Sequence, residues 1–337
     1  MLKSVEILRD NLRDHPAAQA WRAIEPERVE PGMIAVIKQW KNHYKSAIYR
    51  LAGVGPGGLA VIAKRCLVQT AAVERLIYEE FLSRLPLPTL GYYGSVDAPD
   101  GESCWLFLEE ADGDLYSPQN NAHRALAARW LAAVHNTGRH LDWETRLPDR
   151  GPKHYWQLLQ SCRARVREHF TNPNLPVEGA AVLQTVAEQC DVLEEHWNEL
   201  EETCHGMPRT LVHGDFGNKN VRVRPSARGL ELLVFDWEFA GWGVPSTDLA
   251  QESRTISPDL GVYRSCLEGW PMMEDEGRIQ QLAAYGRCFR LLDSMWWESF
   301  ALRFGRPECL IEPIVCLKVF AERLARAFRA AGWRPYD

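Results

Sequence analysis

The residues best suited to chemistry lie in two short polar segments of the chain. Residues 213–220 read HGDFGNKN, and residues 235–238 read FDWE. Asp215 and Asn220 are five positions apart in a polar loop that follows an apolar stretch. Asp236 ends the apolar run LELLVFD, which returns from a turn that begins soon after Asn220. Because a hairpin brings its two ends together, we expect Asp236 to lie beside Asn220.

The residue types at these positions suit phosphoryl transfer. Carboxylate and amide oxygens are hard ligands for Mg²⁺, which binds through few protein groups together with substrate phosphates. Asn220 and Asp236 are therefore predicted to hold a metal ion, whereas Asp215 remains available to accept a hydrogen bond from an attacking hydroxyl. These are the parts that phosphoryl transfer requires.

The same segments carry a family resemblance. HGDFGNKN resembles the HGDxxxxN loop of the aminoglycoside phosphotransferase and choline kinase families, and FDWE…PSTDLA resembles their DWE…D segment. The resemblance is specific at these motifs and covers most of the chain in its order of elements. It implies a protein-kinase-like fold, with ATP (or another nucleoside triphosphate) and Mg²⁺ as cofactors. A second DWE, in LDWE at 141–144, lacks a preceding strand and HGD, and we interpret it as a loop.

Within the motifs, the resemblance implies that Asp215 is the catalytic residue. Asp248, in PSTDLA, resembles the aspartate that steadies the catalytic loop in this family. We expect His213 to bind the loop backbone and His135 to be a packed or surface histidine. For Glu238 two readings stay open, a position near the metal and a salt bridge after DW.

The phosphate-binding side chains are expected in the N-terminal part of the chain. Lys64, in VIAKRC, stands where similar enzymes keep a lysine for the α- and β-phosphates. Arg65 must point to the opposite face of the strand, so we predict that Lys64 faces the phosphates. Its predicted partner is Glu74, in VERLIYEE, with Tyr78 one turn later. The next acids, Glu79 and Glu80, are weaker candidates that also fit a solvated helix face.

Backbone groups near Glu109, Glu110 and Ala111, directly after the strand WLFLE, are predicted to bind the base of the nucleotide. The loop 40–46 (WKNHYKS) is the predicted phosphate-facing loop, although it contains no glycine. Its last residue, Ser46, places a hydroxyl or amide near the phosphates or simply begins a strand.

A glycine-rich segment offers a competing phosphate loop. Gly53, Gly55 and Gly58, in GVGPGG, fit the pattern GxGxxG. Gly58 lies only six positions before Lys64, which leaves no room for a strand, a turn and a returning strand. We therefore predict that GVGPGG is an ordinary hairpin turn.

Hydrophobic periodicity indicates the elements that position these residues. A change to period two at Met33, small and β-branched residues, and turn signals predict strands at 33–39, 47–52, 59–66, 90–95 and 104–109, with a helix at 70–85. Later segments predict helices at 122–135, 155–170, 178–204, 278–304 and 312–330, interrupted by the hairpin NVRVR–PSARG–LELLVFD. In the long helix 178–204, apolar residues at 183, 186, 190, 193, 197 and 200 form one stripe.

Strands with one helix, followed by helices with an embedded hairpin, indicate an α+β, bilobed architecture. We predict an N-terminal nucleotide-binding lobe over residues 1–110, with a helical extension at about 1–30. Residues 111–337 are predicted to form a mostly helical C-terminal lobe that carries the catalytic loop and the acceptor site.

Composition excludes several classes of partner. With 46% hydrophobic and 25% charged residues and a net charge of −6, the chain presents no basic field for nucleic acid or an anionic membrane. No run approaches the ~18 apolar residues of a membrane span. MLKSVEILRDNLRDH lacks the apolar centre of a secretory signal, and the nine cysteines include no CxxC pair. We expect a cytoplasmic protein of unassigned oligomeric state.

We thus predict an ATP- and Mg²⁺-dependent phosphotransferase with a small-molecule alcohol as acceptor. An aminoglycoside or similar amino sugar is the leading candidate for the acceptor; choline or ethanolamine and sugar- or homoserine-type metabolites are alternatives. From another functional class, a non-catalytic nucleotide-binding module is the alternative. The acids of 178–202 fit a solvated face better than a cationic-acceptor site. Four tryptophans could hold a quaternary ammonium or fill the core: Trp242, Trp270, Trp296 and Trp297.

Overall fold

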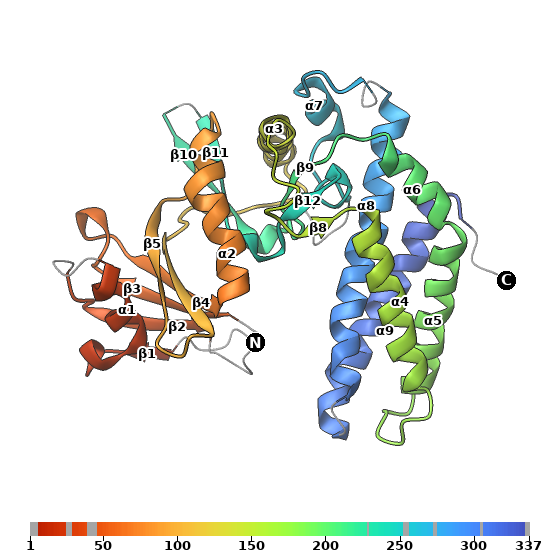
Figure 1. Cartoon of the computed structure of the whole chain (residues 1–337), viewed down its shortest axis with the longest axis horizontal. Coiled ribbons are helices and arrows are strands. Elements are labelled where there is room, and N and C mark those ends of the chain that lie inside the picture. Colours follow the sequence, from red (N-terminus) through yellow and green to blue (C-terminus); the bar gives the residue numbers. More distant parts are fainter. Residues whose placement is uncertain are drawn as a thin grey trace. The chain divides into compact units, whose positions relative to one another are not determined.

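Contacts between residues divide the chain into two units, coloured along the sequence in Figure 1. The computed structural model describes residues 6–24, 29–38, 46–227, 229–251, 256–271, 275–303 and 306–333. Unit 1 comprises Met1–Leu115 and Asn220–Glu238; unit 2 comprises Tyr116–Lys219 and Phe239–Asp337. The hairpin at 220–238, which we predicted within the C-terminal lobe, groups with unit 1. The functional division near residue 110 stays a prediction.

Unit 1 is built on a six-stranded antiparallel sheet with the strand order β1-β2-β3-β4-β6-β5. Its strands are β1 (Glu6–Leu8), β2 (Met33–Lys38), β3 (Ala47–Ala52), β4 (Val61–Leu67), β5 (Tyr92–Asp97) and β6 (Ser103–Glu109). The sequence predictions located β2 to β6 with ends shifted by only a residue or two. The prediction of helices alone over residues 1–30 was wrong, because Glu6–Leu8 pairs along the edge of β2.

Each face of this sheet is covered by one helix. Helix α1 (Pro16–Ile24) packs on β5 and β6, where Trp21 and Phe107 are fully buried. Helix α2 (Val68–Leu76) packs on β4 and β6 of the opposite face and continues through a π-helical turn to residue 84. Odd residues of β4 therefore face α1, and even residues, including Lys64, face α2.

The hairpin joins unit 1 through a second, three-stranded sheet. Strand β10 (Val221–Ser226) pairs antiparallel with β11 (Gly229–Val234) and, on its other side, with β7 (Asp114–Leu115). The register opposes Val221 to Val234. The segments that precede β10 and follow β11 therefore lie side by side, as the hairpin argument predicted.

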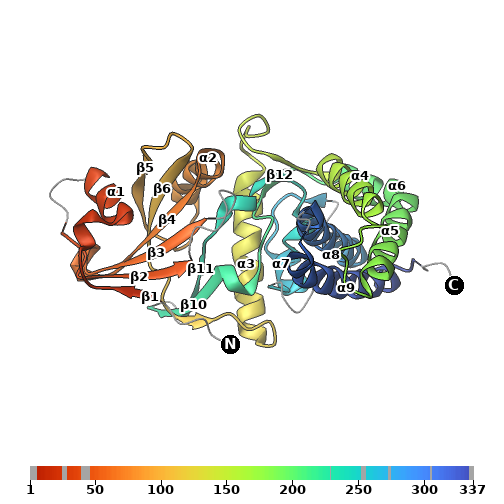
Figure 2. The same ribbon diagram turned by 90° about the horizontal axis from the view of Figure 1, so that it is seen from below.

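Unit 2 is mainly a bundle of four long helices, which Figure 2 shows from below. They are α4 (Pro152–Glu168), α5 (Gly179–Glu195), α8 (Glu276–Ser299) and α9 (Pro307–Ala330), and each packs on two of the others. The predicted apolar stripe at 183–200 is buried. The prediction of one continuous helix was wrong: α5 ends at Glu195, and α6 (Trp197–His205) begins after a break at His196, whose ring stacks on Trp333.

The remainder of unit 2 carries the polar loop of the first motif. A small sheet has the order β8-β12-β9, formed by Asp149–Arg150, Gly241–Gly243 and Thr210–Val212. Helix α3 (Asn121–Gly138) packs on β9 and on α7 (Leu260–Ser265). Gly286 lets α8 approach the segment before Asp248, because a Cβ there would lie 1.7 Å from the Ser246 carbonyl oxygen. Among the described residues, no helix combines the length and apolarity that crossing a membrane requires.

Candidate functional site

Lys64 is the centre of a buried charge cluster in unit 1. Its side chain is 5% exposed, and its Nζ lies 2.6 Å from Glu74 Oε1 and 2.5 Å from Asp236 Oδ1. Arg65 points to the other face of β4 and binds Asp100, as strand alternation predicted. Burial acts to lower the pKa of the Lys64 ammonium, but the surrounding carboxylates outweigh it and hold that pKa well above its usual range. Lys64 therefore carries a full positive charge.

Glu74 comes from helix α2 and is fully buried. Burial, opposed by Lys64 and reinforced by Asp236, raises the pKa of Glu74 to about 7. The main physical reason is that burial disfavours the charged carboxylate; in addition, one ammonium is shared among three carboxylates, so it cannot fully offset that cost. Tyr78, one turn later, is buried and stacks on Tyr92. Glu79 lies on the exposed side of this segment and binds the Tyr92 hydroxyl.

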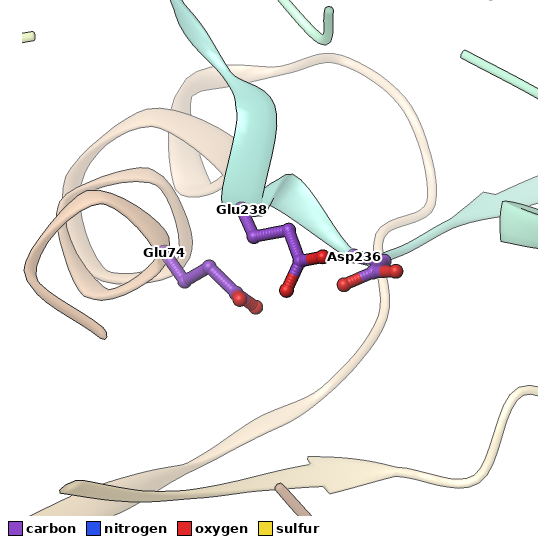
Figure 3. A group of neighbouring side chains, drawn as sticks. All are labelled: Glu74, Asp236 and Glu238. Atoms are coloured by element: carbon purple, nitrogen blue, oxygen red, sulfur yellow. The ribbon is translucent and has the colours of Figure 1, made fainter. Parts of the chain in front are cut away.

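Asp236 and Glu238 follow the end of β11 and turn toward Glu74, as Figure 3 shows. One oxygen from each of the three carboxylates lies within 4.8 Å of the others. Glu238 Oε2 also lies 3.3 Å from Lys64 Nζ, which agrees with the salt-bridge reading of this residue; its position near a metal stays a prediction. Asp236 has a φ of 69°, a left-handed conformation that side chains rarely adopt and that Asp, Asn and Gly tolerate best.

Asn220 lies next to this cluster through the hairpin. It is buried and directly precedes β10, and its backbone carbonyl accepts a hydrogen bond of 3.1 Å from the backbone amide of Phe235. Asp236 is the next residue after Phe235, so the two predicted metal ligands come from neighbouring strand ends. Carboxylate and amide oxygens are the ligand types that fit Mg²⁺.

For the two segments considered for phosphate binding, 40–46 and GVGPGG, the structure gives different results. Ser46 is buried, and its Oγ donates a hydrogen bond of 3.1 Å to Glu238 Oε2, which places it at the cluster. Residues 40–45 of the predicted phosphate loop lie outside the described residues. The glycine segment forms a turn between β3 and β4, with Gly57 at a φ of 65°. This agrees with the prediction that GVGPGG is a hairpin turn.

The segment predicted to bind the base follows β6. The Glu109 amide already donates to the Gly91 carbonyl, at 2.8 Å. The Glu109 side chain pairs with Arg224, and the Glu110 side chain pairs with Arg50. If this segment binds a base, the backbone of Glu110 and Ala111 is therefore better placed than the amide of Glu109.

Asp215 lies in unit 2, in the loop after β9, and is held between two cations. Arg290 Nη2 from helix α8 lies 2.8 Å from Oδ1, and Lys219 Nζ lies 2.7 Å from Oδ2. Burial acts to raise the pKa of the Asp215 carboxyl, but Arg290 and Lys219 outweigh it and hold that pKa below its ordinary value. Asp215 is thus an ionised carboxylate, and each of its two oxygens has one cationic partner and a further lone pair.

The buried carboxylate of Asp248 holds the backbone of the loop that carries Asp215. Its two oxygens accept the amide hydrogens of His213 at 2.8 Å and Gly214 at 3.0 Å. His135 lies between Asp248 Oδ2 and the Tyr263 hydroxyl and is buried rather than at the surface. Burial acts to raise the pKa of Asp248, but His135 and His213 hold it below its usual range. This geometry agrees with the loop-steadying role expected of Asp248.

Sequence reasoning missed both cationic partners of Asp215. Lys219 stands inside the motif and offered a signal, because a residue four positions after an acid in a tight loop can turn back to it. Arg290 offered no such signal, since it lies seventy-five residues from Asp215 along the chain. On α8, burial raises the pKa of Asp293 although Arg150 and Arg290 oppose it, and the negative charge of Asp215 adds to the increase.

The fold is similar to those of several solved small-molecule kinases. The GDP complex of the F108L mutant of aminoglycoside 2'-phosphotransferase-IIIa has a TM-score of 0.61 at 14% identity, covering 93% of this chain and 98% of that one. Choline kinase from Cryptosporidium parvum Iowa II has a TM-score of 0.54 at 12% identity, with 90% and 92% covered. A putative aminoglycoside phosphotransferase from Ralstonia eutropha has a TM-score of 0.53 at 15% identity, with 92% and 98% covered.

These likenesses confirm the predicted α+β, protein-kinase-like fold, with its antiparallel N-terminal sheet and helical C-terminal part. No curated protein matches the chain. A family model described as the phosphotransferase enzyme family matches residues 71–285, which is more than half of the chain and includes both motifs. The chain belongs to the phosphotransferase enzyme family.

Proposed function

We propose that this enzyme transfers the γ-phosphoryl group of a nucleoside triphosphate to a hydroxyl of a small molecule in the cytoplasm. The observation that carries the proposal is the cluster of Lys64 with Glu74, Asp236 and Glu238. A buried lysine surrounded by three acids has an excess of negative charge. A bound cation would balance that excess, which supports a function rather than a purely structural ion pair.

In this proposal the ammonium of Lys64 binds the α- and β-phosphates and Glu74 orients it. The hydroxyl or amide of Ser46 contacts a phosphate oxygen, and the backbone around Glu110 and Ala111 binds the base. In this proposal Glu109 contributes only by its position at the end of β6, directly before the backbone of Glu110 and Ala111. Both ATP and GTP are candidates, because the 2'-phosphotransferase structure contains GDP.

Asn220 and Asp236 would hold Mg²⁺, and Glu238 is the third oxygen donor within reach. When bound, the ion would supply positive charge to the phosphates, which Lys64 alone cannot neutralise. The left-handed backbone of Asp236 supports this role. Such a conformation is unusual for a non-glycine residue, and it clusters at sites where a side chain must be aimed.

Asp215 would orient the acceptor hydroxyl and accept its proton. The acceptor oxygen forms the new bond to the γ-phosphorus, and the bond from that phosphorus to the β-phosphate oxygen breaks. The electron pair of the broken bond stays on the nucleoside diphosphate. The depressed pKa of Asp215 keeps the carboxylate ionised and able to accept a hydrogen bond at neutral pH.

An amine-bearing acceptor, such as an amino sugar, remains the leading candidate. Asp293 on α8 would offer such an acceptor one further carboxyl group, although the charges of Arg150 and Arg290 already act on it. The acids of α5 support it less, because Asp191 and Glu194 pair with Arg163, and Glu178 pairs with Lys318.

The tryptophans offer limited support for a choline-like acceptor. Trp242 and Trp270 are buried, and the Trp270 Nε1 donates to Asn136. Trp296 donates to Ser161, and Trp297 is 40% exposed. A core or packing role therefore accounts for three of the four side chains.

The deciding experiment measures release of nucleoside diphosphate with ATP or GTP, with and without Mg²⁺, against a panel of acceptors. The panel contains aminoglycosides, choline, ethanolamine, sugars and homoserine, and Asp215→Asn is the matched variant. Acceptor-dependent release that the variant lacks would support the proposal. Tight nucleotide binding without transfer to any member would favour the non-catalytic module instead.

A further inference from the structure

Arg290 is a largely buried cation of unit 2 to which neither motif nor the proposed mechanism gives a role. It comes from helix α8, and its side chain is 15% exposed. One guanidinium nitrogen, Nη2, lies 2.8 Å from Asp215 Oδ1, and the other, Nη1, donates to the Gly214 carbonyl oxygen at 3.3 Å. A single planar group therefore binds both the carboxylate of the proposed base and the backbone directly before it.

The shape of the guanidinium sets Arg290 apart from the second cation at Asp215. A guanidinium presents its donors in a rigid, planar fork, so two contacts from it fix direction as well as distance. A lysine ammonium is a compact charge on a flexible stem. Lys219, which binds the other oxygen of Asp215, is of this second kind, and its side chain is 67% exposed. Arg290 is thus the partner that can determine how the carboxylate is turned relative to its own backbone.

The helix that carries Arg290 is itself held against the support of the polar loop. Gly286, one turn before Arg290, packs on the segment before Asp248, where a Cβ would lie 1.7 Å from the Ser246 carbonyl oxygen. Asp248 in turn accepts the amide hydrogen of Gly214 at 3.0 Å. The backbone of Gly214 is therefore bound at its amide by Asp248 and at its carbonyl by Arg290. The close packing at Gly286 fixes α8 for the second of these contacts.

The charge of Arg290 does not by itself explain its position beside a base. Burial acts to raise the pKa of Asp215, but Arg290 and Lys219 outweigh it. A carboxylate with a lower pKa is a weaker base, so an effect of charge alone predicts that removing Arg290 would not slow proton acceptance. An effect on orientation predicts the reverse, because a misplacement of about 1 Å can cost ~10²-fold in rate.

We propose that Arg290 is a positioning residue for phosphoryl transfer: it turns the carboxylate of Asp215 toward the hydroxyl of the acceptor. This inference rests on the proposed function. Arg290 keeps its protons and its contact with Asp215 throughout. The hydroxyl proton passes to Asp215, the acceptor oxygen bonds to phosphorus, and the oxygen of the departing diphosphate retains the electron pair of the broken bond.

The test compares Arg290→Gln and Arg290→Lys with Arg163→Gln as the matched control. The Arg163 side chain is 14% exposed and also pairs with acids, Asp191 and Glu194, but it joins α4 to α5. Turnover is measured at about pH 8, well above the ordinary pKa of an aspartate. Arg290→Gln should lower kcat by ~10²-fold and leave the KM values for nucleotide and acceptor nearly unchanged. Arg290→Lys keeps the charge without the fork and should recover only part of kcat, and Arg163→Gln should match the parent.

A second measurement separates positioning from a structural effect on unit 2. Arg290→Gln is introduced into Asp215→Asn, and single-turnover rates with excess enzyme give the residual transfer. Asparagine has no carboxylate to orient, so the double variant should transfer phosphate as fast as Asp215→Asn alone. A structural disturbance of unit 2 would lower the residual rate further. Thermal denaturation of each variant checks that it is folded.

The outcomes separate the role of Arg290 from the proposed function. An active parent with an equally active or more active Arg290→Gln overturns the positioning role and leaves the proposed function standing. A further loss of rate in the double variant, or full recovery of kcat by Arg290→Lys, also overturns the positioning role. If Arg290→Gln does not fold, Arg290→Lys decides alone, and a kcat equal to that of the parent overturns the role. A parent that transfers phosphate to no acceptor overturns the proposed function and, with it, the role of Arg290.

Discussion

Replacing Asp236 should separate folding from metal-dependent nucleotide binding. Asp236→Ala is a poor choice, because alanine in a left-handed conformation adds strain of ~1–2 kcal/mol. Asp236→Asn keeps the shape and tolerates this backbone, and Asp236→Gly removes the side chain and relieves the strain. The two substitutions therefore remove the same carboxylate with different effects on the backbone.

The charges of the cluster give the expected magnitude. At an effective dielectric constant of 20, loss of the 2.5 Å contact with Lys64 removes ~7 kcal/mol of attraction. The same change relieves at least ~3 kcal/mol of repulsion from Glu238, whose oxygen lies within 4.8 Å, and a smaller repulsion from Glu74, whose pKa is raised to about 7. The opposing effects largely cancel, so without a divalent ion the free energy of unfolding should change by only about 1–3 kcal/mol.

Nucleotide binding in the presence of Mg²⁺ should change far more. Asp236 would be the charged one of the two predicted ligands, and loss of a charged contact of this kind costs ~2–5 kcal/mol. Both variants should thus bind Mg-nucleotide at least ~30-fold more weakly. Denaturation in EDTA measures the first effect, and calorimetry at varied Mg²⁺ measures the second.

Asp100→Asn is the matched control, because Asp100 also has a cationic partner at 2.5 Å, Arg65, on the opposite face of β4. It should leave nucleotide affinity unchanged. The reasoning fails if folded Asp236→Asn binds Mg-nucleotide as tightly as the parent. It also fails if both variants lose several kcal/mol of stability in EDTA, because the ion pair would then serve the fold.

Three further outcomes are expected. Asp215→Asn should lower kcat by ~10²–10⁴-fold with little change in nucleotide affinity, because the proposed role of this residue is to contact the acceptor and not the nucleotide; a loss below tenfold would assign the base elsewhere. The double substitution Gly55→Ala, Gly57→Ala should cost ~1–2 kcal/mol of stability, since Gly57 has a φ of 65° and a Cβ at Gly55 would lie 3.1 Å from Leu59 and Val61. It should leave the KM for nucleotide unchanged. A large KM increase in a folded variant would restore GVGPGG as the phosphate loop. Asp248→Asn should destabilise the protein by ~3–5 kcal/mol at neutral pH. Because the folded pKa of Asp248 is depressed, its stabilising effect is present above its unfolded pKa and is lost as the pH falls. The difference in free energy of unfolding between parent and variant, measured by chemical denaturation, should therefore narrow toward pH 3. A difference that does not depend on pH would show that charge is not the cause.

The sequence by itself determined the elements whose signals are local. Strands β2 to β6 were located from short runs rich in apolar and β-branched residues, bounded by turns. The stripe of the 178–204 segment shows helical period because it reflects one buried face. Alternation also determined that Lys64 and Arg65 point to opposite faces. The adjacency of Asn220 and Asp236 followed from the hairpin, since register and turn length are written into neighbouring residues.

Contacts between distant segments were decided only by the tertiary structure. Pairing with β2 made Glu6–Leu8 a strand against its helical pattern, and the stacking of His196 on Trp333 accompanies the break in the long helix. Arg290 reaches Asp215 from α8, and this contact depends on helix packing that no motif encodes. The sequence identified the carboxylates because their chemistry is fixed by residue type; which cation balances each one depends on which side chains the packing brings within a few ångströms.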